Sequence, residues 1–166
     1  MLRAGDQFIS GRSGGVVSAF YPYRGGYLGV APAHIFRYSG TDELRIGAHR
    51  SRVVHYCSDA DIAFFLVLGQ CEPTRFARPR LGDAELINSA RRMGCRVTEA
   101  SWSIAYLVLQ PGNLPGPGDS GTPVFQDGAV VGMLININLG TCRGTVITGE
   151  FIRSKLSEYA QSSPGA

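Results

Sequence analysis

Residues 116–124 read Gly-Pro-Gly-Asp-Ser-Gly-Thr-Pro-Val, and the strongest inference about this chain begins there. Gly118 and Gly121, on both sides of the Asp119-Ser120 pair, predict a tight turn that presents a hydroxyl and leaves room for a substrate backbone to approach. The candidate oxyanion-binding residues in this turn are Gly118, Asp119 and Ser120, and we expect the N–H groups of Gly118 and Ser120 to point at the oxyanion. A serine hydroxyl alone is a weak nucleophile, so the turn also predicts a base and a group that orients the base.

Three histidines are candidates for the base. His34 lies within residues 29–35, at the end of an apolar strand where a turn is expected to begin. His49 lies in a polar turn between strands, and His55 lies within an alternating strand. His34 is the favoured base, and the alternative for it is a core histidine with no chemical role.

The orienting acid is sought at the start of the apolar run of residues 61–67. Asp61 heads this run, so its carboxylate is expected at the mouth of a buried strand. A buried carboxylate needs a partner, and an imidazole N–H supplies one. Asp59 on the same turn is the alternative acid, and a strand-capping carboxylate is the alternative role for Asp61.

Ala33-His34, Asp61-Ile62-Ala63 and residues 118–124, in that order, resemble the motifs of the chymotrypsin-like (trypsin-like) serine proteases. The resemblance extends from about residue 13 to residue 156. It implies Ser120 as nucleophile, His34 as general base and then acid, and Asp61 as the group that fixes the tautomer of the histidine. The short spacings, 27 and 59 residues, resemble those of compact viral and bacterial intracellular members.

The strand pattern supports an all-β chain. Ten runs of β-forming residues recur between turn residues, and only residues 32–36 and 150–160 suggest helix. The expected strands are residues 15–21, 26–31, 43–48, 52–57, 62–68, 91–100, 102–110, 122–125, 129–138 and 143–148. The resemblance implies two antiparallel six-stranded β-barrels with a C-terminal helix and the active site between the barrels.

The expected domain organisation follows from the position of the Pro- and Arg-rich stretch. Residues 1–72 form the N-terminal barrel with the histidine and aspartate, and residues 73–84 link the barrels. Residues 85–166 form the C-terminal barrel with the serine, the closing helix and a tail. The tail, residues 161–166, is expected to be disordered.

Composition excludes several classes of protein. Of the 166 residues 44% are hydrophobic, too many for a disordered chain, and no apolar run approaches the roughly 20 residues that span a bilayer. The net charge is +3, and the basic residues, fifteen of them arginines, are scattered along the sequence, which argues against a nucleic-acid partner. No cysteine or histidine spacing matches a metal site, and no cofactor is expected.

Departures from the family pattern predict a cytoplasmic enzyme that needs no N-terminal cleavage. The four cysteines show no disulfide pattern, and the first residues lack a secretion signal, so the expected compartment is the reducing cytoplasm of a bacterium or an infected cell. The chain does not begin with the Ile-Val-Gly-Gly end that activates secreted relatives. Asp119 must therefore pair with a backbone N–H or an arginine, and no N-terminal cleavage is expected.

The specificity pocket that the resemblance implies contains no acidic residue. Leu114 takes the place of its floor, Ile135 or Ile137 lies at its mouth, and Gly144 lies on the facing strand. This lining favours a small or apolar uncharged residue before the cleaved bond. The predicted function is a serine endopeptidase that works through an acyl-enzyme on protein or peptide substrates. Its targets are a viral polyprotein, including its own precursor, or a specific intracellular protein. The alternative is a self-cleaving or inactive protease-fold module with a structural or peptide- or RNA-binding role.

Overall fold

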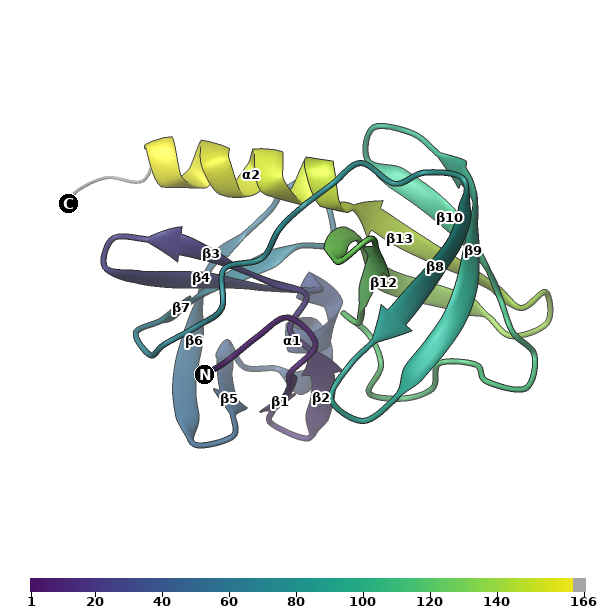
Figure 1. Cartoon of the computed structure of the whole chain (residues 1–166). Coiled ribbons are helices and arrows are strands. Elements are labelled where there is room, and N and C mark those ends of the chain that lie inside the picture. Colours follow the sequence, from purple (N-terminus) through teal and green to yellow (C-terminus); the bar gives the residue numbers. More distant parts are fainter. Residues whose placement is uncertain (163–166) are drawn as a thin grey trace.

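The chain, described by a computed structural model over residues 1–162, folds into two lobes of antiparallel strands (Figure 1). The first lobe comprises β1 (Gln7–Ser10), β2 (Ser13–Val16), β3 (Ala19–Tyr23), β4 (Gly26–Ala31), α1 (Ala33–Ser39), β5 (Glu43–Ile46), β6 (His49–Tyr56) and β7 (Ala63–Val67). The second lobe comprises β8 (Gly82–Ile87), β9 (Arg92–Ala100), β10 (Ile104–Leu109), β11 (Pro123–Gln126), β12 (Ala129–Asn138) and β13 (Arg143–Thr148). A helix, α2 (Gly149–Ser162), follows β13.

The second lobe is the closed six-stranded barrel expected for this half of the chain. Its strands run in the order β10-β13-β12-β11-β8-β9, and every neighbouring pair is antiparallel. Alternate residues of β10 point inward, with Leu107 and Leu109 buried and Tyr106 and Val108 exposed. Asp127 and Gly128 form the two-residue turn of the β11–β12 hairpin, as the Asp-Gly signal predicts.

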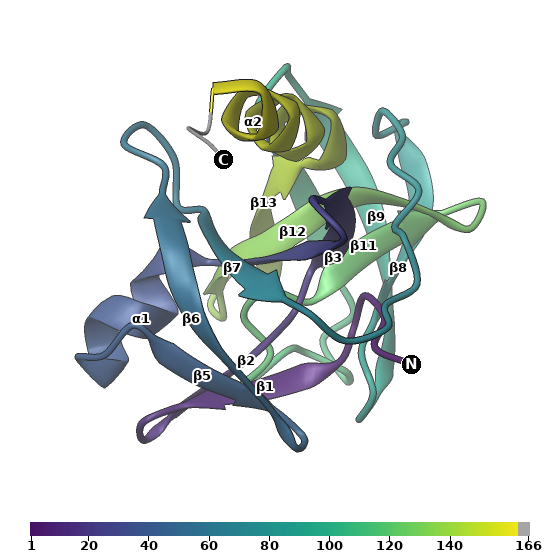
Figure 2. The same cartoon turned by 90° about the vertical axis from the view of Figure 1, so that its left-hand side faces the viewer.

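The first lobe differs from the expected six-stranded barrel. It is a seven-stranded sheet in the order β2-β1-β5-β6-β7-β4-β3, with β2 and β3 at its two ends (Figure 2). The single strand expected at residues 15–21 is divided between β2 and β3, because the chain bends at Val17 and Ser18. The Val17 N–H donates to Asp6 O and the Ser18 N–H to Val30 O, both at 2.8 Å, so these residues do not continue one ladder.

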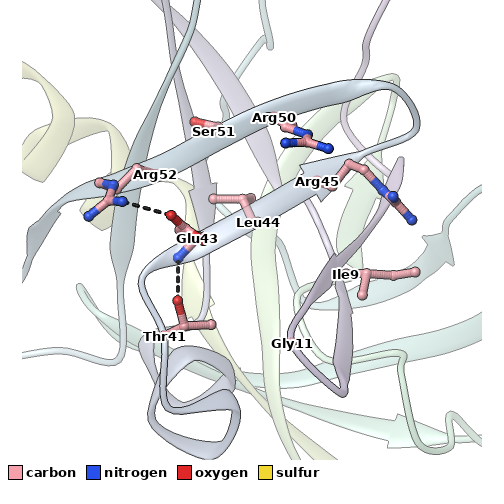
Figure 3. A pocket seen from close by; sticks show the side chains of 9 residues that line it. All are labelled: Ile9, Gly11, Thr41, Glu43, Leu44, Arg45, Arg50, Ser51 and Arg52. Carbon is pink, nitrogen blue, oxygen red and sulfur yellow. Dashed lines mark hydrogen bonds and ion pairs between the residues drawn. The ribbon is translucent and has the colours of Figure 1, made fainter.

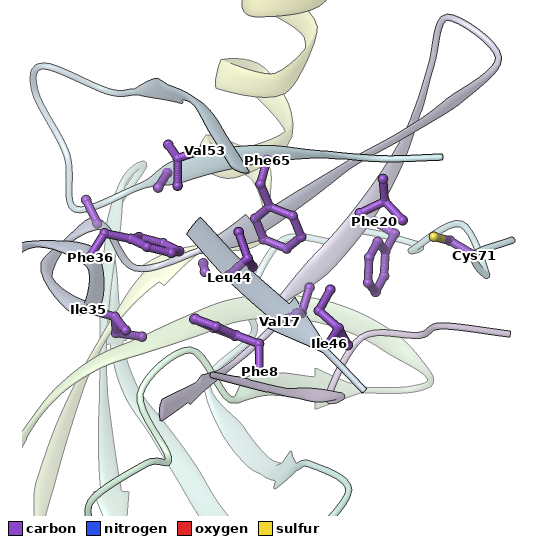
Figure 4. Close-up of a cluster of buried hydrophobic side chains, with 14 residues drawn as sticks. Phe8, Val17, Phe20, Ile35, Phe36, Leu44, Ile46, Val53, Phe65 and Cys71 are labelled. Atoms are coloured by element: carbon purple, nitrogen blue, oxygen red, sulfur yellow. The ribbon is translucent and has the colours of Figure 1, made fainter. Parts of the chain in front are cut away.

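Two separate apolar clusters fill the lobes, and a third joins them. The first-lobe cluster packs Phe8 between Phe36 and Phe65, at ring-centroid distances of 5.7 and 6.5 Å (Figure 4). The second lobe has its own cluster around Leu86, Leu107 and Leu134. The joining cluster takes residues from both lobes and α2: Ala19, Leu28, Val30, Cys57, Ile62, Phe64, Met133, Ile147, Ile152 and Leu156. The helix therefore buries its apolar face where the two lobes meet.

The helices are longer than the sequence predicts, and the linker is shorter. Residues 32–36 suggest one turn, whereas α1 continues to Ser39, and α2 begins one residue before the expected helix and ends two after it. β8 begins at Gly82, within the range expected for the linker. Of the expected tail, residues 161 and 162 belong to α2, and residues 163–166 lie outside the described range. Neither helix within residues 1–162 is long and apolar enough to span a membrane.

Candidate active site

The serine lies just after a tight turn that begins at Gly116. The Asp119 N–H donates to Gly116 O at 3.0 Å, and the Gly116 N–H donates to the Asp119 carboxylate at 2.8 Å. Proline at the second position and glycine at the third, where φ is +89°, match a type II turn. Only glycine adopts that backbone conformation without strain, so Gly118 fixes the shape of the loop that leads to Ser120.

Both lobes hold the backbone that follows the serine. The Val16 N–H in β2 donates to Ser120 O at 2.9 Å, and the Gly121 N–H donates to Leu134 O in β12 at 2.8 Å. Gly121 has φ +95°, and a Cβ atom there would lie 2.1 Å from Val16 O, so no other residue fits. The buried Ser18 hydroxyl donates to Gly121 O at 2.6 Å. The serine is therefore positioned at a junction of the two lobes.

Asp119 is buried and finds both kinds of partner that the sequence predicts. The Gly116 N–H binds one carboxylate oxygen, and an Arg91 guanidinium nitrogen lies 3.4 Å from the same oxygen. Sequence reasoning missed Asn88, whose side-chain amide donates to Asp119 Oδ1 and to Thr122 Oγ1, each at 3.0 Å. These contacts all come from residues 88–116, so the Asp119 carboxylate has partners other than an N-terminal amine.

His34 is held in the first turn of α1 by Asp61. The His34 backbone N–H, which has no partner within the helix, donates to Asp61 Oδ1 at 2.8 Å. The other carboxylate oxygen lies 2.5 Å from His34 Nδ1. Asp61 thus holds the histidine at two points, its backbone and its ring. Both side chains are about three-quarters buried.

The electrostatics of this pair fix the histidine tautomer. Burial acts to raise the pKa of Asp61. The side-chain hydrogen bond from His34, the charge of the His34 ring and the His34 backbone N–H act against burial, and together they lower the pKa of Asp61 below its usual value. Asp61 is therefore ionised at neutral pH and can only accept a hydrogen bond. His34 Nδ1 must carry the proton, which leaves Nε2 of the neutral ring with its lone pair.

His34 Nε2 lies 3.3 Å from Ser120 Oγ, so the three predicted side chains meet. The other candidates are engaged elsewhere. Asp59 pairs with Lys155 at 2.9 Å, and the His55 ring packs against the rings of Phe64 and Tyr159. His49 is exposed at the start of β6.

The candidate oxyanion residues differ in how their N–H groups are used. The Asp119 N–H is bonded inside the turn. The N–H groups of Gly118 and Ser120 make no hydrogen bond within residues 1–162 and remain available to a ligand. They belong to alternate residues of one loop, beside the serine hydroxyl.

A cleft of about 350 Å³ adjoins His34 and Ser120. Two of the four predicted pocket residues, Ile135 and Ile137, line it. Leu114 instead packs against the second-lobe cluster. Gly144 faces that cluster too: a Cβ atom at Gly144 would lie 3.3 Å from a methyl carbon of Leu134.

One edge of β12 is open beside this cleft. β11 pairs with β12 only as far as Met133, and residues 136–138 pair with β13 alone among the described strands. The register shifts between Leu134 and Asn136, which marks a bulge. The Ile137 N–H donates to the side-chain oxygen of its neighbour Asn136 at 2.8 Å. The side chain of Asn136 therefore occupies a hydrogen bond that an added strand could make.

Comparison with solved structures places this arrangement among known folds. The active form of the Rv3671c protease from M. tuberculosis matches with a TM-score of 0.72 and 18% identity, over 96% of this chain and 82% of that one. A glutamic-acid-specific serine protease matches with a TM-score of 0.71 and 14% identity, over 95% of this chain and 97% of that one. The fold is chymotrypsin-like.

The solved structures that match this chain include a viral protein. The NSP4 proteinase of Equine Arteritis Virus matches with a TM-score of 0.58 and 21% identity, over 88% of this chain and 73% of that one. No protein-family model matches the sequence, and the search of curated proteins found no significant match. The resemblance seen in three short motifs is thus confirmed at the level of the fold.

Proposed function

We propose that this chain is a serine endopeptidase with Ser120 as nucleophile, His34 as general base and Asp61 as the orienting carboxylate. The observation that carries the proposal is the continuous contact from Asp61 Oδ2 through His34 to Ser120 Oγ, at 2.5 and 3.3 Å. These residues come from three separate elements in two lobes, and they meet in the geometry that the activation of a hydroxyl requires.

The reaction follows from the tautomer. Ser120 Oγ attacks the peptide carbonyl carbon, and its proton passes to His34 Nε2. His34 then protonates the leaving amine as the C–N bond breaks, which leaves an ester between the serine and the acyl part of the substrate. Water repeats the sequence with His34 as base, releasing the acid and restoring the hydroxyl. Asp61 stabilises the imidazolium formed in each half.

The oxyanion of each tetrahedral intermediate would lie against the N–H groups of Gly118 and Ser120. Both groups are free of partners in the described chain, and the type II turn fixes one of them in place. Donors set in advance stabilise the developing charge without reorganisation and contribute about 3–4 kcal/mol each in well-studied enzymes.

We propose that the substrate adds a strand to the open edge of β12 and places a small or apolar side chain before the cleaved bond. Ile137 pairs with Gly144 across the two strands, so a branched side chain narrows the space that the expected pocket would occupy. The four proposed pocket residues include no acid to neutralise a buried cation, so Arg and Lys are disfavoured at that position. A peptide library should show Ala, Val or Leu ahead of Arg and Lys by at least about tenfold.

The proposed compartment is a reducing one. All four cysteines are free thiols, and Cys57, Cys71 and Cys95 are buried in the apolar clusters. Burial raises the pKa of Cys57 and Cys71 to about 11 and that of Cys95 to about 12, so these thiols stay protonated and inert. A cytoplasmic polyprotein or a specific intracellular protein remains the proposed target.

Covalent labelling tests the proposal directly. A fluorophosphonate reacts with a serine only when a base activates its hydroxyl, so wild type should gain one adduct, mapped to Ser120 by mass spectrometry. Ser120→Ala and His34→Ala should not be labelled, whereas Ser89→Ala, which changes an exposed serine outside the site, should be labelled like wild type. A folded wild-type protein that takes no label would instead favour a non-catalytic binding module.

A further inference from the structure

A large cavity lies outside the candidate active site. It is a groove of about 650 Å³ on the outer face of the first lobe, crossed by β1, β5 and β6 (Figure 3). Its lining comprises Ile9, Gly11, Thr41, Glu43, Leu44, Arg45, Arg50, Ser51 and Arg52. We refer to this surface as the arginine groove.

Two arginines of the arginine groove have no counter-charge. Arg52 pairs with Glu43 at 2.7 Å, but Arg45 and Arg50 make no ion pair or hydrogen bond through their side chains within residues 1–162. The β5–β6 register sets Arg45 directly opposite Arg50. Like charges at opposite positions of an antiparallel pair destabilise the sheet, so this pair lowers stability unless a ligand neutralises it.

An exposed apolar residue continues the same row. Ile9 on β1 lies directly opposite Arg45, and about half of its surface is exposed. Residues paired across strands share one face, so Ile9, Arg45 and Arg50 form a line across three strands. Figure 3 shows the three side chains on the same side of the β5–β6 hairpin. The row offers one apolar contact and two cationic ones.

A second cavity lies between the arginine groove and the loop that precedes Ser120. It has a volume of about 320 Å³, shares Ile9 and Arg45 with the groove and extends past Gly14 and Gly15 to Gly118. Gly118 is two residues from Ser120 and supplies one of the proposed oxyanion donors. This cavity and the open edge of β12 are lined by different residues, since Leu134, Ile135, Asn136 and Ile137 line the other cleft.

We propose that the arginine groove is a substrate-recognition site for an acidic peptide segment on the leaving-group side of the cleaved bond, with Arg45 and Arg50 binding its carboxylates and Ile9 contacting an apolar side chain. The proposal rests on the proposed protease function for its position relative to the cleaved bond. If the acyl part pairs with β12, the leaving part continues past Gly118 toward Ile9 and Arg45.

The lining favours a peptide over a nucleic acid. No aromatic side chain lines the groove, and single-stranded nucleic acids bind through aromatic stacking along a cationic track. Glu43 adds a carboxylate within the same groove, which would repel a continuous row of phosphates. Two free guanidinium groups and one apolar contact instead match a short segment with spaced carboxylates.

Binding is measured with Ser120→Ala, so that no cleavage competes. The probe is a fluorescein-labelled peptide, Asp-Glu-Leu-Glu-Asp, and its amide counterpart, Asn-Gln-Leu-Gln-Asn, is the matched control. The acidic peptide should bind, should bind more weakly as salt is raised from about 50 to about 500 mM, and should exceed the amide peptide at low salt. Combining Arg45→Gln with Arg50→Gln should weaken binding of the acidic peptide by about tenfold.

Two matched variants separate the groove from general charge. Arg153→Gln removes an exposed charge on α2 and should leave binding unchanged, whereas Arg52→Gln removes an arginine already paired with Glu43 and should have a smaller effect than Arg45→Gln. The double variant should unfold at the same or a higher temperature than its parent, because the opposed charges are gone. Equal binding by the double variant and by Arg153→Gln would overturn the proposal.

Turnover supplies the second arm. A series of cleavable peptides carries an Asp-Glu pair at successive positions on the leaving-group side. With the wild-type protein, kcat/KM should rise by about tenfold when the pair stands at one of these positions. The variant that combines Arg45→Gln with Arg50→Gln and keeps Ser120 should lose this gain. A chain that cleaves nothing but binds the acidic peptide through Arg45 and Arg50 would refute the protease and keep the binding site. A single-stranded oligonucleotide that binds more tightly than the peptide, and through the same two arginines, would refute the assignment to a peptide.

Discussion

The two lobes differ in how they are closed and in what they contribute. The second lobe is a closed barrel, and it presents Ser120 on a turn locked by glycines and by Asp119. The first lobe is an open sheet, and it presents His34 from a short helix and Asp61 from the loop before β7. The proposed nucleophile therefore depends on backbone geometry, whereas the proposed base depends on one side-chain pair.

The contact between the lobes explains how side chains from two different lobes can meet in one site. The joining cluster and α2 bury apolar side chains from both lobes, and the backbone after Ser120 is bonded to β2 and β12 at once. A closed lobe and an open lobe thus share one hydrogen-bonded junction, where the candidate site lies. Changes in either lobe should reach the site through that junction.

The largest effect should come from removing one proposed catalytic group from each lobe. His34→Ala in the first lobe and Ser120→Ala in the second should each lower kcat by about 10⁵- to 10⁶-fold, and the double variant should be no worse, because the groups act as a unit. Asp61→Asn should cost about 10⁴-fold by favouring the wrong tautomer. Stopped assays on one peptide measure kcat for these four variants. If the losses of His34→Ala and Ser120→Ala added up in the double variant, the two lobes would act separately.

The junction itself is tested by Gly121→Ala. A Cβ atom at Gly121 would lie 2.1 Å from Val16 O, and the residue has φ +95°, so we expect a loss of about 3–5 kcal/mol in the free energy of unfolding. Gly128→Ala is the control, since Gly128 also has positive φ but nothing lies within 4 Å of its Cβ position. It should lose about 1–2 kcal/mol in urea denaturation. Equal losses would show that the lobes are not in close contact there.

The fold was more predictable from sequence in its long strands than in its short ones. β12 and β13 match the expected residues 129–138 and 143–148, because ten and six β-forming residues stand between clear turns. β1 was missed, since four residues with two buried positions give too short an alternation. β8 was also missed: it follows a Pro- and Arg-rich segment, and its buried Ala84 and Leu86 give only a weak pattern.

The candidate site was also predicted incompletely, because part of it depends on a short strand. The motifs identify His34, Asp61 and Ser120, but the partners of Asp119 depend on a hairpin that the sequence did not reveal. Asn88 and Arg91 lie at the β8–β9 turn, so without β8 no pattern distinguishes Arg91 from the other arginines. Gly121 was expected to leave room for a substrate, whereas the structure places Val16 O against it.

Asn88→Ala tests the lock on the serine turn in the second lobe. The variant leaves the buried Asp119 and Thr122 oxygens without their shared donor, so the free energy of unfolding should fall by about 1–3 kcal/mol. kcat should fall by about tenfold, with KM nearly unchanged, because the oxyanion donors lose their fixed position. Arg91→Gln should cost less, since that arginine is partly exposed and lies 3.4 Å away. If Arg91→Gln lowered the free energy of unfolding and kcat more than Asn88→Ala, the serine turn would be held mainly by the charge of Arg91.

The pair in the first lobe should make stability depend on pH. Because the pKa of Asp61 is lowered in the folded chain, ionised Asp61 stabilises the fold above the unfolded value of about 3.9, and this stabilisation is lost as pH falls through the folded pKa. The difference in unfolding free energy between wild type and Asp61→Asn should therefore be full at about pH 6 and should shrink below about pH 4. Asp59→Asn, at an exposed ion pair, should show a smaller difference. A constant difference for Asp61→Asn would contradict this linkage.

The smallest effect should come from the one open edge of the second lobe. Because the side chain of Asn136 accepts the Ile137 N–H at 2.8 Å, a substrate strand that bonds to this N–H must first displace an internal acceptor. Asn136→Ala frees the donor, so KM for an extended peptide should fall by about two- to fivefold with kcat unchanged, since a neutral hydrogen bond contributes about 0.5–1.5 kcal/mol. Asn138→Ala is the control, because the Asn138 side chain accepts from Thr141 in the β12–β13 turn and should not alter KM. A rise in KM in Asn136→Ala would mean that this side chain binds the substrate, and the edge of the closed barrel would then be selective through Asn136 rather than blocked by it.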